Sequence, residues 1–205
     1  MNFLGIDFED WYHPQLIQKY LKKDDHEPRM FKGIDKIIEM LRKTETTATF
    51  FVVGKILQTS PEILDKIIEN GHEIGFHTMN HDRIDSREFK NNFLDEVADF
   101  SKLTNKRSKG FRAPTFSLNK KSSWIIDSLV KADYLYDSSI VPAKTNLYGI
   151  PNADNKPYKI TSKNLENDST EGKILEFPLL ITKFLGKKIP AAGGFYLRTL
   201  PSRII

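Results

Sequence analysis

Two histidines spaced four residues apart are the side chains of this sequence best suited to chemistry. His77 and His81 follow an apolar run, residues 72–76, that we expect to form a buried strand. Imidazole is the commonest neutral metal ligand in proteins, and borderline divalent metals such as zinc suit it. A metal site needs a third protein ligand, usually a carboxylate, with positions left open for water and substrate. The histidine pair therefore predicts part of a metal site.

The missing carboxylate is expected from the start of the chain. Asp7, Glu9 and Asp10 follow a short apolar stretch, residues 2–6, that is typical of a buried strand. Carboxylates packed together repel one another unless a cation or hydrogen bonds compensate them. Because active sites of parallel α/β folds lie at the carboxyl ends of strands, we predict that this segment meets the histidines around one divalent metal. A solvated turn, or a helix N-cap at Asp10, is the alternative interpretation.

Strands and helices alternate along most of the chain, which favours a parallel α/β sheet or barrel. Apolar residues at helical spacing predict helices at residues 31–43, 61–70, 89–100 and 125–130. Ser60 and Pro61 are expected to be the N-cap and first residue of the second of these helices. Further strands are predicted at residues 46–54, 109–114, 134–139 and 174–179. We expect one domain over residues 1–205, in which the polar, Pro-broken segment 147–171 is a loop or hairpin excursion.

Composition restricts the class of protein. Of the 205 residues, 39% are hydrophobic and 28% are charged, as in soluble globular proteins. The net charge is +4 with scattered lysines, so no nucleic-acid partner is expected. The absence of cysteine excludes disulfides and thiolate metal sites. No apolar run approaches the ~20 residues that span a bilayer, and no signal peptide precedes the first strand, so we expect no transmembrane segment and a cytoplasmic location.

Several motifs occur in the order of one family. They are Asp7-x-Glu9-Asp10-Trp11, residues 48–54, Gly71-His72-Glu73-Ile74-Gly75-x-His77-x3-His81, Phe111-Arg112-x-Pro114, and residues 133–139. On these motifs the chain resembles the polysaccharide deacetylases of the NodB-homology class, carbohydrate esterase family 4. The likeness is greatest to the exopolysaccharide-locus branch, whose first motif is Asp-x-Glu-Asp and which carries Gly-Gly-x-Tyr-x-Arg-x-x-Pro, here residues 193–201.

The resemblance implies a fold and an activity. The fold would be a distorted (β/α) barrel of the seven-stranded type, with fewer than eight repeats and incomplete at its C-terminal end. The activity would be metal-dependent removal of N-acetyl groups from an amino sugar in a surface polysaccharide or its precursor, so the partner would be a carbohydrate substrate. One divalent metal, with Zn²⁺ the expected ion, would be held by an Asp and two His.

The resemblance also implies roles for single residues. His77 and His81 match the two metal histidines, and Asp7 matches the first acid, the catalytic base. Asp10 is the favoured third metal ligand, with Glu9 the alternative as ligand or base. Arg112 matches a catalytic arginine that pairs with the base and keeps it ionised. Substrate contacts are expected from Trp11, Pro114, Thr115, Phe116, Tyr134 and Asp137.

The sequence departs from the family pattern in one respect. The family uses a late histidine as general acid, and this sequence has no histidine after His81. In the favoured branch that histidine follows the Gly-Gly-x-Tyr segment, so we expect a chain cut short at its C-terminus. Loss of such an acid typically slows turnover by ~10²–10⁴-fold. Two other functions stay open: a small cyclic-amide hydrolase of the allantoinase or imidase type, and a non-catalytic carbohydrate-binding protein.

Overall fold

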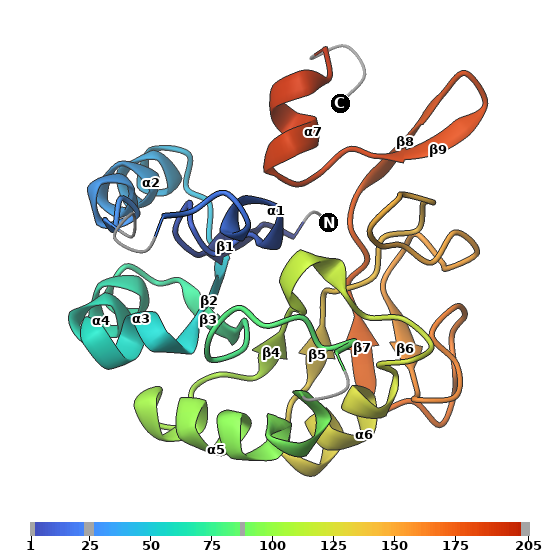
Figure 1. Cartoon of the computed structure of the whole chain (residues 1–205), viewed down its shortest axis with the longest axis horizontal. Helices are drawn as coiled ribbons and strands as arrows, with labels where there is room; N and C mark the ends of the chain where they lie inside the picture. The colour runs from blue at the N-terminus through green and yellow to red at the C-terminus, as the bar shows by residue number, and fades with distance from the viewer. Residues whose placement is uncertain (1–2, 23–26, 87–88, 202–205) are drawn as a thin grey trace. The chain divides into compact units, whose positions relative to one another are not determined.

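The chain divides into two compact units in a computed structural model that describes residues 3–22, 27–86 and 89–201 (Figure 1). The first unit is formed by Met1–Asp82 and Asn92–Gly110, and the second by Arg83–Asn91 and Phe111–Ile205. The division falls within the short strand β4 (Gly110–Phe111).

The first unit is built on parallel strands covered by helices. Its elements are β1 (Gly5–Phe8), α1 (Gln15–Gln18), α2 (Phe31–Lys43), β2 (Thr49–Val52), α3 (Gly54–Thr59), α4 (Glu62–Glu69), β3 (Glu73–Phe76) and α5 (Phe93–Leu103). β2 pairs with β1 on one side and with β3 on the other, both in parallel. Phe8 is aligned with Val52, and Val52 with Phe76, so the three strands end together. The residues that follow β1 and β3 therefore emerge at one edge of the sheet.

Aromatic side chains form much of the core of the first unit. Phe50, Phe76, Phe93 and Phe100 are each 0% exposed, and the rings of Phe76 and Phe100 lie 4.6 Å apart. Full burial of such a side chain typically contributes about 1.5–3 kcal/mol. The carboxyl edge of β1–β3 thus rests on a rigid, densely packed base.

The second unit contains three paired strands, which belong to the same seven-stranded sheet as β1–β4, and a separate hairpin. Its elements are η1 (Phe89–Asn91), η2 (Pro114–Phe116), α6 (Trp124–Lys131), β5 (Tyr136–Asp137), β6 (Tyr158–Ile160), β7 (Ile174–Glu176), β8 (Ile181–Phe184), β9 (Lys187–Pro190) and α7 (Gly194–Thr199). β7 pairs in parallel with β5 and antiparallel with β6, which lies inside the polar segment 147–171. β8 and β9 form a two-stranded antiparallel sheet of their own.

The α/β class with a mostly parallel sheet is confirmed, and α2 begins and ends where its periodicity predicts. Barrel closure stays a prediction. The strand predicted at residues 46–54 is shorter than expected, because Gly54 already begins α3. The N-cap assignment of Ser60 is wrong: Pro61 precedes α4, and the Ser60 N–H instead donates to the Ile56 carbonyl at the end of α3.

No helix among the described residues combines the length and the apolar character needed to cross a membrane. The cytoplasmic location inferred from the sequence stays a prediction.

Candidate metal and catalytic site

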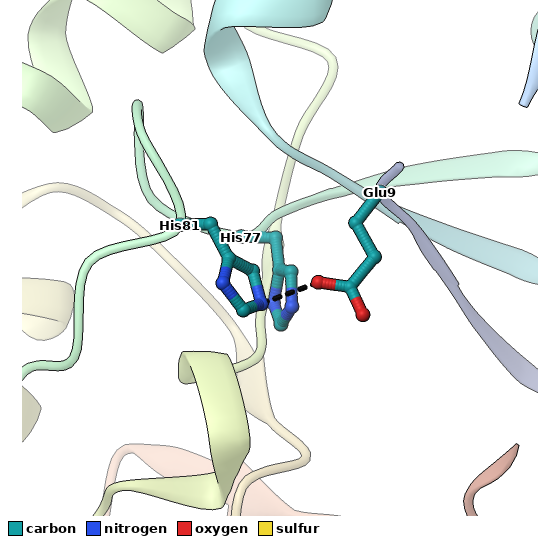
Figure 2. A group of neighbouring side chains, drawn as sticks. All are labelled: Glu9, His77 and His81. Atoms are coloured by element: carbon teal, nitrogen blue, oxygen red, sulfur yellow. Dashed lines mark ion pairs between the residues drawn. The ribbon is translucent and has the colours of Figure 1, made fainter. Parts of the chain in front are cut away.

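Glu9, His77 and His81 form a cluster at the carboxyl edge of β1–β3. Glu9 follows β1 directly and His77 follows β3, so the aligned strand ends bring the two residues to one edge. The candidate ligand atoms of the three side chains all lie within 4.8 Å of one another (Figure 2). His77 and His81 are buried, whereas Glu9 is only partly so. The first unit therefore supplies by itself two imidazoles and a carboxylate that face one point.

The orientation of His81 is set by a backbone carbonyl. Its Nδ1 lies 3.1 Å from the His13 carbonyl oxygen, which can only accept, so Nδ1 carries a proton and donates. The other ring nitrogen, Nε2, then points to Glu9 Oε2 and is in contact with it (Figure 2). A carbonyl behind a histidine ligand is the usual way in which the ligating tautomer is fixed.

The cluster fits a divalent cation. A neutral His81 presents a lone pair to the Glu9 carboxylate, so that two acceptors face each other. Glu9 Oε2 is buried and, among the described residues, receives no hydrogen bond beyond this contact. A proton on Nε2 or a cation between the two atoms is needed to make the arrangement favourable. Two imidazoles and one carboxylate are a ligand set that zinc and related divalent metals accept.

The loop that carries His81 is held from two sides. The Gly54 and Lys55 N–H groups at the start of α3 donate to the carbonyls of Thr78 and Met79, at 2.9 and 2.8 Å. The Met79 N–H donates to Glu96 Oε2 at 2.9 Å. Thr78 and His81 have φ angles of +58° and +62°, a conformation that typically costs non-glycine residues about 1–3 kcal/mol. The surrounding contacts therefore impose the loop geometry that directs His81 toward Glu9.

Gly54 is required for this close approach of α3 to the loop. A Cβ at position 54 would lie 2.2 Å from Met79 Sδ and 3.3 Å from the Met79 Cα. The second contact is with backbone, which cannot move aside as a side chain can. A larger residue at position 54 would therefore have to push aside the Met79 side chain and press on the Met79 backbone, between the two histidines.

Asp10, the favoured third ligand on sequence grounds, lies outside the cluster. Its carboxylate accepts hydrogen bonds from the N–H groups of Trp11 at 2.9 Å, Arg29 at 2.8 Å and Met30 at 3.3 Å. Met30 is the N-cap of α2, so Asp10 satisfies free donors at the start of that helix, where negative charge is favourable. The structure thus gives Asp10 the capping role, and Glu9, the alternative, occupies the place beside the histidines.

Asp7 and Trp11 lie on either side of these acids. Asp7 is partly buried in β1, opposite Phe51, and Glu9 follows two residues later, just past the end of the strand. The Trp11 indole N–H donates to the Glu27 carbonyl at 3.1 Å, and the Arg29 guanidinium lies 5.4 Å from its ring. Trp11 is thereby tied to the segment that precedes α2.

Arg112 belongs to a second polar group, buried within the second unit. Its Nε donates to the Ser138 carbonyl at 2.9 Å and its Nη2 to Ser138 Oγ at 2.7 Å. Ser138 Oγ in turn donates to the Phe177 carbonyl at 2.8 Å. Two bonds from one guanidinium fix the direction of the side chain, so Arg112 is a cation held in a single orientation.

Asp137 and Glu176 are the acids of this second group, and both are 0% exposed. Ser139 Oγ donates to Asp137 Oδ1 at 2.6 Å, and the Ile140 N–H donates to Glu176 Oε1 at 2.9 Å. Burial, and then the adjoining Asp137 carboxylate, raise the pKa of Glu176 well above its ordinary value. Burial also raises the pKa of Asp137. The raised pKa values of both groups favour a proton shared between the adjoining Asp137 and Glu176 carboxyls.

Glu176 did not emerge from the sequence as a site residue. The available signal was a single acid inside the apolar run 174–179, where an unpaired charge would be costly. Its partners, Asp137 and the Ile140 N–H, come from β5 and the loop after it, and only the pairing of β7 with β5 brings them near.

The remaining predicted substrate contacts lie in the second unit. Pro114, Thr115 and Phe116 form η2, directly after Arg112 and Ala113, and the Arg112 guanidinium lies 5.9 Å from the Phe116 ring. Thr115 and Phe116 have φ angles of +53° and +49°, so this turn is also strained. Tyr134 is buried, at 5% exposed. The structure thus gathers Glu9, His77 and His81 in one unit, and Arg112, Asp137 and Glu176 in the other.

Comparison with known proteins gives two family matches. The profile of the polysaccharide deacetylase family matches residues 20–132, more than half of the 205 residues, and that span contains His77, His81 and Arg112. A domain of unknown function (DUF3473) matches residues 138–205.

Individual relatives match shorter segments. A peptidoglycan-N-acetylglucosamine deacetylase of Bacillus cereus is 33% identical over 87 residues, which are 41% of this chain and 40% of that protein. A peptidoglycan deacetylase of Helicobacter pylori is 26% identical over 112 residues, which are 53% of this chain and 37% of that protein. The matched segments therefore span well under half of these two relatives.

Solved structures share the fold. A Mycobacterium smegmatis protein assigned as a polysaccharide deacetylase superposes with a TM-score of 0.62 at 20% identity, covering 87% of this chain and 58% of that one. An allantoinase superposes with a TM-score of 0.56 at 16% identity, covering 87% and 61%. At these identities the likeness concerns the fold alone. Together with the match over residues 20–132, it shows that the chain belongs to the polysaccharide deacetylase family.

Proposed function

We propose that this protein is a metal-dependent hydrolase that removes N-acetyl groups from an amino sugar of a surface polysaccharide or its precursor. The observation that carries the proposal is the meeting of Glu9 with His77 and His81 at the carboxyl edge of the parallel strands. Two relatives of the same family are named for deacetylation of peptidoglycan, a polymer of N-acetylated sugars. The bond broken would be the carbon–nitrogen bond of the acetamide, with acetate as the product.

Within the family we propose the exopolysaccharide-locus branch. Two sequence features support it: the opening motif Asp7-x-Glu9-Asp10 and the segment Gly193–Pro201, which lies inside the second family match. The sugar polymer of that branch is then the proposed substrate class.

The metal ligands would be Glu9, His77 and His81, with zinc the expected ion. When bound, such an ion polarises a carbonyl oxygen as a Lewis acid and lowers the pKa of a coordinated water toward ~7. The chain itself fixes the orientation of the ligand side chains before any metal binds. The His13 carbonyl keeps the proton of His81 on Nδ1 and so leaves Nε2 available toward Glu9.

Asp7 is the proposed general base. It lies in β1, two residues before Glu9, and its carboxylate would accept a proton from the attacking water. The water oxygen adds to the acetyl carbon, the carbon–nitrogen bond breaks, and the sugar nitrogen takes up a proton as acetate leaves. Arg112 is proposed as a fixed cation of the catalytic machinery, and Trp11 with residues 114–116, Tyr134 and Asp137 as the residues that shape the substrate site.

Acetate release tests the proposal. The full chain, loaded with zinc, is incubated with N-acetylated chitooligosaccharides and with peptidoglycan, and acetate is measured enzymatically. We expect release that a chelator stops, that zinc restores, and that Asp7→Asn lowers by roughly 10²–10⁴-fold.

Two other results would replace the proposal. Binding of these sugars with no acetate released would indicate a non-catalytic carbohydrate-binding protein. Ring opening of a small cyclic amide, with no action on sugars, would indicate a hydrolase of the allantoinase type.

A further inference from the structure

The β8–β9 hairpin joins a firmly packed base to an unpacked apolar tip. At its base, Ile181 packs against a buried cluster that includes Val141 and Leu179. Figure 1 labels the two strands of the hairpin. At its tip, Phe184 is 47% exposed and Leu185 86% exposed, with Gly186 completing the turn. The base holds the hairpin in place, while the two largest apolar side chains of the tip remain in water.

The tip carries a residue that the turn itself disfavours. Leu185 and Gly186 have φ angles of +48° and +75°, so both central positions of the turn are left-handed. Hairpin turns of this kind strongly prefer Asn, Asp or Gly at both positions. A leucine there is a poor choice for folding and, at 86% exposure, gains nothing from burial. Folding of the chain therefore does not explain Leu185, whereas an interaction with a partner would.

The charges of the hairpin are also unfavourable for the isolated molecule. Lys183 lies directly opposite Lys188, and Lys187 lies opposite Phe184. Like charges that face each other across paired strands are destabilising. Lys188 donates to the Pro151 carbonyl at 3.0 Å, and neither Lys183 nor Lys187 forms an ion pair with a described residue.

The surrounding sequence has a single sign of charge. Residues 177–205 contain three lysines and two arginines and no aspartate or glutamate. This segment therefore offers no acid that could neutralise the hairpin lysines. A basic surface around an exposed apolar tip is complementary to a partner that is both anionic and apolar.

We propose that the tip of the β8–β9 hairpin, residues 183–188, docks on a membrane surface of anionic phospholipid. Phe184 and Leu185 enter the boundary between headgroups and acyl chains, and the lysines face the phosphates. A second copy of the chain fits less well, because it would bring lysines against lysines. A sugar polymer fits less well too, since sugars are held by aromatic faces and hydrogen bonds, whereas Leu185 offers only an aliphatic side chain.

Sedimentation of the full chain with lipid vesicles tests this inference without any need for deacetylase activity. Vesicles of phosphatidylcholine alone are compared with vesicles that also contain phosphatidylglycerol. We expect binding to the anionic vesicles, weakened by salt, and little binding to the neutral ones. Removal of one hairpin lysine, as in Lys183→Gln, should weaken binding about fivefold.

Leu185→Asn is the decisive variant, because folding and docking predict opposite effects. Asparagine suits the left-handed turn, so the urea midpoint should stay the same or rise. Vesicle binding should fall roughly tenfold, since an apolar side chain is lost from the interface. Leu135→Asn is the matched control: Leu135 is 61% exposed but lies outside the hairpin, and the substitution should leave binding unchanged.

Three results would overturn the inference. The first is equal or absent binding to both kinds of vesicle. The second is vesicle binding that Leu185→Asn leaves intact. The third is hairpin-dependent self-association in sedimentation velocity, or retention on an anionic polysaccharide, without binding to vesicles.

Discussion

The cluster of Glu9, His77 and His81 and the group of Arg112, Asp137 and Glu176 both contain carboxylates but balance their charges in different ways. In the first unit, Glu9 and His81 present acceptors to each other beside His77, and a cation or proton is needed between them. In the second unit, Arg112 supplies a fixed positive charge, and the raised pKa values of Asp137 and Glu176 favour a proton shared between them. The first group needs a cation or proton to balance its charge, whereas the second balances part of its charge with its own arginine and leaves Glu176 Oε2 without a hydrogen-bond partner among the described residues.

This difference shows how a buried carboxylate acquires a role. Removal from water penalises its charge, and the compensation is either internal, by a proton or an arginine, or external, by a bound ion. A carboxylate whose charge is balanced within the protein serves as structural support. A carboxylate whose charge must be balanced by a bound ion forms part of a binding site. The predictions that follow are ordered from the largest expected effect to the smallest.

Replacement of Arg112 by alanine should have the largest effect on stability. It removes the positive charge that stabilises the ionised carboxyls of Asp137 and Glu176 by lowering their pKa values, and it leaves Ser138 without its donor. Loss of one member of a buried charged group typically costs about 3–5 kcal/mol. Urea unfolding measures the change. A loss below about 1 kcal/mol would mean that the second group does not depend on its arginine.

Zinc should stabilise the wild-type chain and not a variant that lacks His81. A ligand present at about 100 times its dissociation constant raises the free energy of unfolding by about 2.7 kcal/mol. Thermal unfolding with zinc and with a chelator measures the shift, and His81→Ala should abolish it. If His81→Ala is stabilised as much as wild type, the metal binds elsewhere.

Gly54→Ala should disturb the histidine loop, because the new methyl group would overlap the buried Met79 side chain and approach the Met79 Cα closely. Overpacking of this kind typically costs about 1–3 kcal/mol. Gly33→Ala is the matched control: nothing lies within 4 Å of a Cβ there, and Gly33 is inside α2. The control should gain about 0.5–1 kcal/mol from helix propensity. Equal effects of the two changes in urea unfolding would contradict the close approach of α3 to the loop.

The smallest effect should be a change in the pH dependence of stability in Glu176→Gln. The pKa of Glu176 is raised on folding, so the folded chain binds more protons than the unfolded chain above the ordinary value of 4.5. Wild-type stability should therefore fall as the pH rises from that value toward the raised pKa. Glutamine keeps a donor for Asp137 and an acceptor for the Ile140 N–H without titrating, so its profile should be flatter. Urea unfolding midpoints of wild type and Glu176→Gln, measured across this pH range, test the prediction. Parallel pH profiles of the two proteins would contradict the shared proton.

Much of the architecture was accessible from the sequence because local patterns determine it. The spacing of Ile34, Ile38 and Leu41 predicts α2 with both ends correct. The strand that delivers His77 follows from the apolar run before it. The β8–β9 hairpin was not predicted, since its strands mix exposed lysines with apolar residues and lack a regular alternation.

The choice between Glu9 and Asp10 as the third metal ligand was harder to predict from the sequence, because it depends on tertiary contacts. Glu9 and Asp10 are adjacent, and their side chains leave the chain in different directions. The sequence does not show that the N–H groups of Arg29 and Met30 donate hydrogen bonds to the Asp10 carboxylate. Glu176 was missed for the same reason, since its hydrogen-bonding partner Asp137 belongs to a neighbouring strand.

The central claim is that Glu9 completes a metal site with His77 and His81. Zinc titration of matched variants tests this claim most directly. Calorimetry of the wild-type chain should show one strong site per chain. Glu9→Gln should weaken zinc binding by at least about 10–100-fold, the range typical for loss of even an outer partner of a ligand. Asp10→Asn should keep nearly full affinity, because asparagine also caps helices well. The opposite pattern, with affinity lost in Asp10→Asn and kept in Glu9→Gln, would contradict the account.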